Sequence, residues 1–222
     1  MKKHTVYSEA AYLLGLLLLA IGTAITARMD LGISMVVAPA YLLHLYVPGL
    51  SFGLAEYVLQ AVVLAATMLV LRRVRLGYLL SFATTVVYGV LLDGAMSLAA
   101  LLPLHSWVLR IGSYGLGALL CTAAIALLFR SYLPPAAYEL FVKEVAAKFG
   151  WKVSRVKLVY DCASCVIAVL LSLLLFGQLE AVGIGTVACA VVYGPLIGLF
   201  DRILERHFTF TDKLSLRRKA YE

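Results

Sequence analysis

The chain has few charged residues. Asp, Glu, Lys and Arg make up 14% of its 222 residues, whereas about 25% is usual for a soluble domain. A water-facing globule is therefore excluded. Cysteine is also scarce, and all four cysteines lie in apolar runs, which argues against a disulfide framework.

Motifs for nucleotide or covalent chemistry are missing. The sequence contains no Walker motif, no dinucleotide-binding fingerprint and no nucleophile–base pattern. Cys162 and Cys165 form a C-x-x-C pair, but no further ligands accompany them, so we interpret them as packing residues. We therefore expect no enzyme, no cofactor, no metal site and no ATP hydrolysis by this chain alone.

Apolar residues are abundant instead. They make up 63% of the chain, and the mean hydropathy is +0.97. A spanning helix needs about 20 such residues. The stretches long enough to span are 8–27, 52–71, 76–100, 107–129, 156–177 and 181–204. The sequence therefore predicts an all-α membrane protein with six transmembrane helices, which contacts the lipid bilayer and no nucleic acid.

Two further segments suit spanning less well. Segment 33–46 contains Pro39 and follows Gly32, whereas segment 135–149 carries four charges that would be costly at the bilayer centre. Each is predicted to form a short extra helix, either re-entrant or lying on the membrane surface.

The distribution of basic residues predicts the orientation. With the N-terminus in the cytoplasm, all 19 Lys and Arg residues except Arg28 and Arg110 fall on the cytoplasmic side, as the positive-inside rule requires. We expect a multi-pass protein of the bacterial cytoplasmic membrane with both termini in the cytoplasm. Residues 207–222 then form a basic cytoplasmic tail, suited to phospholipid contact.

The chain also resembles itself at an offset of 102–105 residues. Tyr12 and Gly15 fall on Tyr114 and Gly117, and the Val-Val-Tyr-Gly sequence that ends at Gly89 recurs further along the chain. These matches predict a duplication with halves 1–105 and 106–206.

Each half would contain three spans and one short helix. An odd number of spans gives the halves opposite orientations. Such inverted repeats occur in secondary transporters, whose substrate sites lie near the membrane midplane between the halves.

Short glycine motifs recur in both halves. They are Met-Asp-Leu-Gly-Ile-Ser at 29–34, Pro-Gly-Leu-Ser-Phe-Gly at 48–53, Arg-Leu-Gly at 75–77, Leu-Pro-Pro at 133–135, Gly-Trp-Lys-Val-Ser-Arg at 150–155, Val-Gly-Ile-Gly-Thr at 182–186 and Tyr-Gly-Pro-Leu at 193–196. In this order of motifs the chain resembles the YczE/YitT-like family of small bacterial integral membrane proteins. It departs from the family at Ser34-Met35-Val36, where a Pro-Trp-Asp-like sequence is common. The resemblance implies a membrane location and transport, but no substrate.

Acidic residues inside spans are candidate ion-coupling or substrate-binding groups, because hydrocarbon makes an unpaired charge expensive. The sequence nominates Asp93, Asp161 and Glu56. A structural role is open for each: Asp93 paired with Arg110, Asp161 paired with Lys157 one turn earlier, and Glu56 exposed to water.

Hydroxyl residues near the span centres form the second group of candidates. Tyr88 and Tyr193 would be symmetry mates, and Thr85 and Thr186 offer hydrogen-bond partners. They would line a polar site between the halves. Alternatively, the tyrosines pack over neighbouring glycines and hold helices together.

The function expected from these features is a small secondary transporter or permease for an unidentified small molecule. Two alternatives stay open. One is the substrate-binding membrane subunit of an ATP-driven importer, which would need an ATPase partner. The other is an accessory or sensor membrane protein that transports nothing.

Overall fold

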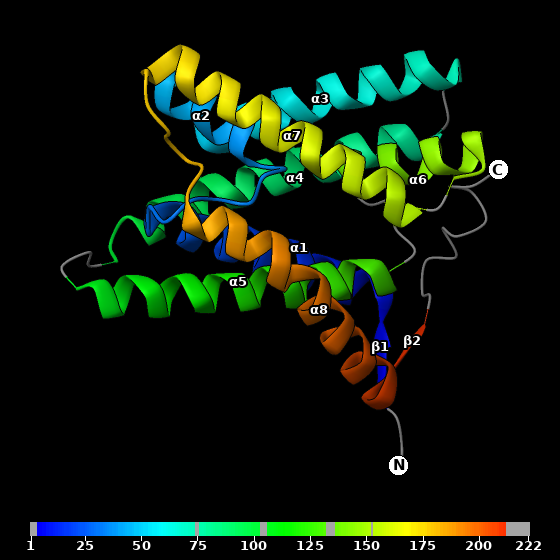
Figure 1. Ribbon diagram of the computed structural model, residues 1–222. Helices are drawn as coiled ribbons and strands as arrows, with labels where there is room; N and C mark the ends of the chain where they lie inside the picture. Colours follow the sequence, from blue (N-terminus) through cyan, green and yellow to red (C-terminus); the bar gives the residue numbers. More distant parts are fainter. Residues whose placement is uncertain (1–3, 74–75, 103–105, 132–135, 152, 212–222) are drawn as a thin grey trace.

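The computed structural model describes residues 4–73, 76–102, 106–131, 136–151 and 153–211 (Figure 1). These ranges contain eight helices and two short strands. The helices are α1 (Ser8–Arg28), α2 (Ala38–Tyr46), α3 (Phe52–Leu71), α4 (Leu76–Ala99), α5 (Trp107–Arg130), α6 (Ala137–Phe149), α7 (Val153–Phe176) and α8 (Ile184–His207). The strands are β1 (His4–Tyr7) and β2 (Phe208–Thr211).

Six of the helices are long and apolar enough to cross a membrane, namely α1, α3, α4, α5, α7 and α8. The predicted six-span fold is therefore confirmed. The two remaining helices, α2 and α6, fall within the two segments predicted to be short.

The strand pair is a feature that the all-α prediction lacks. β1 and β2 pair in parallel, with His4 opposite Phe208 and Tyr7 opposite Thr211. Because β1 leads into α1 and β2 follows α8, the pair places both described chain ends at one end of the bundle (Figure 1). Following the orientation expected from the sequence, we name this the inner end and the opposite one the outer end. Of the predicted basic tail, residues 212–222 lie outside the described residues.

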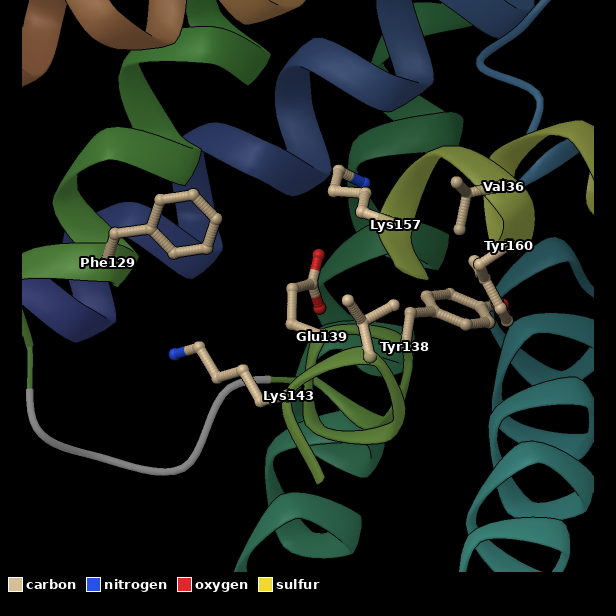
Figure 2. Close-up of a pocket in the computed structure, with 8 residues that line it drawn as sticks. Val36, Phe129, Tyr138, Glu139, Lys143, Lys157 and Tyr160 are labelled. Carbon is tan, nitrogen blue, oxygen red and sulfur yellow. The ribbon is translucent and has the colours of Figure 1, made fainter. Parts of the chain in front are cut away.

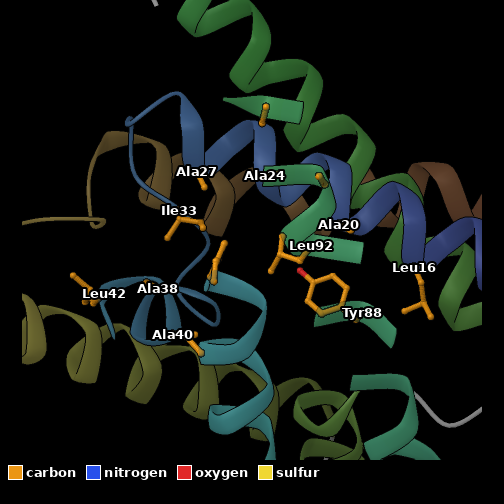
Figure 3. Packing of buried hydrophobic residues seen from close by; sticks show 14 of the residues in the cluster. Leu16, Ala20, Ala24, Ala27, Ile33, Ala38, Ala40, Leu42, Tyr88 and Leu92 are labelled. Atoms are coloured by element: carbon orange, nitrogen blue, oxygen red, sulfur yellow. The ribbon is translucent and has the colours of Figure 1, made fainter. Parts of the chain in front are cut away.

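Helices α1 and α5 pack along each other at the centre of the bundle. Small residues allow the close approach: a Cβ on Gly22 would lie 2.7 Å from the backbone oxygen of Gly117. Ala20 and Ala24 of α1 are fully buried, and they pack toward Tyr88 and Leu92 of α4 (Figure 3). Such small-residue contacts are typical of helix packing in membranes, where dispersion rather than the hydrophobic effect holds helices together.

Two of the remaining spans, α4 and α8, flank this central pair. α4 packs against α1 and α3, whereas α8 packs against α5 and makes no extended contact with α7 among the described residues. α8 is consequently the least buried span, at 6% of its apolar window against 56% for α1.

The short helices lie along two of the spans. α6 lies alongside α3. Tyr138 bonds to Glu56 at one end of this contact, and Lys148 donates to the Val70 carbonyl at the other. α2 lies alongside α7, and Tyr46 at the end of α2 packs on Phe176 at the outer end of α7. Both helices therefore start deep in the bundle and run outward, α6 to the inner end and α2 to the outer end.

Candidate functional site

A pocket lies where the starts of the two short helices meet. It has a volume of about 50 Å³, enough for one or two water molecules or a small ion. Its lining comes from the turn before α2 and from α5, α6 and α7 (Figure 2). The lining residues are Val36, Phe129, Tyr138, Glu139, Val142, Lys143, Lys157 and Tyr160.

Local sequence explains why α2 begins where it does. Pro39 stands in the first turn of α2, a position where its missing N–H costs nothing. The first-turn N–H groups of a helix have no partner within the helix, and they carry the positive end of its dipole. Val36 and Tyr138 both line the pocket, so two helix N-termini approach it from opposite ends of the bundle.

Charged side chains surround the pocket. The Glu139 carboxylate points toward Lys157, and the Lys143 ammonium lies 5.7 Å from the centre of the Phe129 ring (Figure 2). Burial raises the pKa of Glu139, an effect that the positive charge of Lys157 opposes. The pocket therefore holds two cations and one carboxylate of weakened acidity.

Behind Tyr138 lies a second, fully buried acid, Glu56. Only 1% of Glu56 is exposed, and the Tyr138 hydroxyl donates to its Oε2 at 2.5 Å. The other carboxyl oxygen, Oε1, has no hydrogen-bond partner. Among the described residues, no Lys, Arg or His forms an ion pair with Glu56. The Gln60 side chain, one turn further along α3, also interacts with this carboxyl group. A buried acid without a cation is unusual, since burial of an unpaired charge is costly.

Gln60, one turn after Glu56, fixes the start of α6. Its Oε1 accepts hydrogen bonds from the Thr85 hydroxyl at 2.8 Å and from the Ala137 backbone N–H at 3.2 Å. One of the otherwise unpaired amides at the N-terminus of α6 is thereby satisfied. The same contact ties α4, α3 and α6 together beside the pocket.

A chain of hydroxyl and thiol groups crosses the bundle centre. The Tyr88 hydroxyl donates to Thr23 Oγ1 at 3.2 Å, and Thr23 Oγ1 lies 3.8 Å from Cys121 Sγ. On the far side, the Tyr193 hydroxyl interacts with the thiols of Cys121 and Cys189. Tyr88 and Tyr193 therefore reach one network from opposite sides of the α1–α5 pair.

Two further tyrosines bond in corresponding places. The Tyr12 hydroxyl of α1 bonds to Thr84 of α4. The Tyr114 hydroxyl of α5 bonds to the Cys189 thiol of α8 at 3.0 Å. Each contact pins a flanking span to one member of the central pair.

Asp93 has a different set of partners from the expected one. Its carboxylate accepts from the Ser51 hydroxyl and from the Gly53 N–H, both at 2.6 Å. Arg110 instead donates to the Met29 carbonyl at 2.6 Å and pairs with Asp30. Asp93 therefore caps the N-terminus of α3 at the outer end.

Asp161 and Thr186 also lie in local structural contacts. The Lys157 ammonium donates to the Asp161 carboxylate at 3.2 Å, one helical turn apart. The Thr186 side chain accepts from the Gly183 N–H at 3.1 Å and caps the start of α8. The Asp161 contact is the structural alternative that the sequence left open for this residue.

The chain matches a known sequence family. Residues 6–202 match the model of DUF6198, described as a family of unknown function. The chain belongs to this family. No curated protein and no solved structure matches it.

In this DUF6198 member, the structure brings together only part of the predicted site. Glu56 and Thr85 lie beside the pocket, joined through Gln60, and Tyr88 lies nearby. Asp93 and Thr186 lie at the outer end, Tyr193 lies beyond the central helix pair, and Asp161 reaches the pocket only through Lys157.

Several residues of the pocket were not among the predicted ones. Gln60 carries a detectable signal, because it is a polar residue one turn after Glu56 inside an apolar span. Tyr138 and Glu139 carry no such signal in the sequence, because their role depends on how deeply α6 enters the bundle. Within the described ranges no cluster of three His, Cys, Asp or Glu side chains is arranged to hold a metal ion.

Proposed function

We propose that this protein is a small secondary transporter of the bacterial cytoplasmic membrane, with both termini in the cytoplasm. It binds a small solute bearing an anionic group in the pocket between two inverted repeats. The observation that carries this proposal is a pocket lined both by Val36, in the turn before α2, and by Tyr138, in the first turn of α6, two short helices that run to opposite ends of the bundle. Interrupted helices with facing N-termini are typical of transporter sites near the midplane.

The inverted repeat is supported by corresponding contacts. The α1–α4 bond between Tyr12 and Thr84 has a counterpart in the α5–α8 bond between Tyr114 and Cys189. Tyr114 follows Tyr12 by 102 residues, and Cys189 follows Thr84 by 105. The two contacts therefore relate by the same offset that the sequence motifs follow.

The close contacts between α1 and α5 are related by a similar offset in the sequence. Gly22 approaches Gly117, and 102 residues separate these positions from Ala124 and Gly15, respectively. A Cβ on Gly15 would lie 3.3 Å from the Ala124 backbone oxygen. The α1–α5 crossing is therefore made of two equivalent close approaches, as a two-fold axis in the membrane plane requires.

The chemistry of the pocket favours an anionic group on the solute. Lys143 and Lys157 line the pocket together with the Glu139 carboxylate, and residues at the starts of α2 and α6 complete this part of its wall. Helix N-termini and lysines both stabilise anions. The aromatic rings of Phe129 and Tyr160 supply apolar walls beside these charged groups.

The two ends of the bundle differ in a way that suits alternating access. At the outer end the halves are joined by backbone hydrogen bonds, from Ile33 N to Ala181 O at 2.8 Å and from Gly185 N to Leu31 O at 2.7 Å. On the inner side, the exposed Lys143 lies at the pocket. The described arrangement therefore fits a state closed on the outside, with its pocket reached from the inside.

A difference between the repeats supports the same interpretation. α3 and α4 pack tightly through Gly53 and Gly89, whereas a Cβ on Gly194, the counterpart of Gly89, would meet nothing within 4 Å. In the opposite state α7 would close on α8 while α3 separates from α4. Rocking of one repeat against the other would produce this exchange.

The resemblance to YczE/YitT-like membrane proteins agrees with this proposal. The importer alternative uses the same pocket, with an ATPase partner docked on the protein. In the accessory or sensor alternative, the protein moves no solute across the membrane.

Ligand binding is the first experiment. Purified protein is heated in the presence of several hundred metabolites, because a ligand at 100 times its dissociation constant stabilises the fold by about 2.7 kcal/mol. We expect anionic hits that are lost in Lys157→Met and kept in Lys148→Met, because Lys148 donates to the Val70 carbonyl and does not line the pocket. A shift from neutral compounds alone, or the same hits in both variants, would contradict the proposed site, and co-purification of an ATPase would favour the importer.

A further inference from the structure

The buried acid behind the pocket has no cation beside it to balance a negative charge. Glu56 accepts a hydrogen bond from the Tyr138 hydroxyl and interacts with the Gln60 side chain, its Oε1 has no hydrogen-bond partner, and the residue is 1% exposed. Structural acids in this chain look different: Asp93 accepts two hydrogen bonds at a helix start, and Asp201 accepts a bidentate contact from Arg130.

The groups around Glu56 do not neutralise a negative charge. The titratable side chains that face it are Tyr88 from α4, Tyr138 and Glu139 from α6, and Tyr160 from α7. None of these is a cation. On α2, the His44 ring bonds to the Leu50 carbonyl and stacks on Phe52. A proton is therefore the ligand that makes Glu56 compatible with its surroundings, since the neutral acid avoids an unpaired buried charge.

We infer that Glu56 is the proton-binding site of this protein and that Tyr138 separates it from the solute pocket. This inference rests on the proposed transport function and names its coupling ion. In the described state Glu56 holds the proton as a neutral carboxyl group. When α6 moves and carries Tyr138 away, the Oε–H bond breaks, the proton passes to water in the pocket, and the carboxylate remains until another proton arrives.

Position gives Tyr138 this separating role. Its hydroxyl contacts Glu56, while its side chain forms part of the pocket wall beside Glu139 (Figure 2). Because Tyr138 stands in the first turn of α6, a displacement that carries this turn away from α3 breaks the contact with Glu56. Occupation of the pocket and release of the proton are thereby linked through one side chain.

Infrared spectroscopy tests this inference without any substrate. The protein is placed in lipid nanodiscs at neutral pH, and spectra of the wild type and Glu56→Gln are subtracted. We expect a C=O stretch of a protonated carboxyl group in the wild type that is lost in Glu56→Gln. In Tyr138→Phe the band moves to higher frequency because its carbonyl loses a hydrogen bond, whereas the matched control Tyr57→Phe leaves it in place.

A carboxylate stretch in place of the protonated band would overturn the inference, as would a band that persists in Glu56→Gln. Should Glu56→Gln fail to fold, the comparison of Tyr138→Phe with Tyr57→Phe decides alone, and an unshifted band overturns the inference. If the band assigns the proton to Glu56 but no solute is ever transported, the proposed function fails and the proton site stands. If a solute is transported but transport does not respond to a pH gradient, the proposed function stands and the coupling to protons fails.

Discussion

The Asp93 carboxylate of α4 accepts a hydrogen bond from the Gly53 N–H of α3 at 2.6 Å and so fixes the two helices at the outer end. The same carboxylate accepts from the Ser51 hydroxyl at 2.6 Å, and Ser51 also caps α3 by accepting from Leu54 N at 3.1 Å. An acid at this place satisfies orphan N–H groups and complements the helix dipole.

Asp93→Ala should therefore lower the stability of the protein. Hydrogen bonds to a charged group contribute roughly 1.5–3 kcal/mol, and their loss also leaves the Gly53 amide unpaired. Unfolding in mixed micelles measures the change. Asp161→Ala is the control, since an exposed pair one helical turn apart contributes only about 0.3–0.5 kcal/mol. Equal losses in the two variants would contradict the capping role of Asp93.

Gly89 and Gly194 should respond differently to the same substitution. A Cβ on Gly89 would lie 2.9 Å from the Gly53 backbone oxygen, whereas one on Gly194 would meet nothing. Gly89→Ala should cost about 1–3 kcal/mol through overpacking, and Gly194→Ala should leave stability nearly unchanged. If α7 closes on α8 during transport, Gly194→Ala should slow solute movement nonetheless. Matching stability losses would argue against the difference between the repeats.

Tyr88→Phe should have a modest effect. The variant removes the hydrogen bond to Thr23 Oγ1 but keeps the ring packed in the core, so the expected loss is about 1 kcal/mol. Thr23→Val, which removes the acceptor, should cost a similar amount, and the double variant should cost less than the sum of both. Strict additivity in this double-mutant cycle would show that the two hydroxyl groups do not interact.

Stability should fall as pH rises above the ordinary pKa of glutamate, and Glu139 should contribute to this. Burial raises the pKa of Glu139 in the folded protein, so between its unfolded and folded pKa values the folded state binds more protons than the unfolded one. Stability then decreases with pH across that window. Glu139→Gln should remove this component, so that its melting temperature exceeds that of the wild type increasingly toward neutral pH. A constant difference would contradict the raised pKa.

The spans could be predicted from the sequence because their signal is local. Runs of about 20 apolar residues define α1 and α3 without reference to any partner. The strand pair could not, since β1 and β2 are four residues each and pair only because α1 and α8 bring the chain ends together.

The candidate site was predicted only where polarity interrupts an apolar run. Glu56 and Thr85 stand out inside their spans, and both lie beside the pocket. The sequence could not distinguish Glu56 from Asp93, because the difference lies in tertiary partners: Asp93 meets the start of α3, whereas Glu56 meets Tyr138 from a helix 82 residues away. The depth of α6 in the bundle could not be predicted from the sequence either, since its four charges suit either a surface helix or a protein-lined cavity.

Solute uptake tests the central proposal most directly. Protein is reconstituted into liposomes, which are incubated with an isotope-labelled extract of bacterial metabolites with and without an imposed pH gradient. Mass spectrometry then compares the contents with those of protein-free liposomes. We predict that one anionic or zwitterionic compound accumulates, that the gradient increases its accumulation, and that Glu56→Gln abolishes this response. Contents that match protein-free liposomes under both conditions would contradict the transporter proposal.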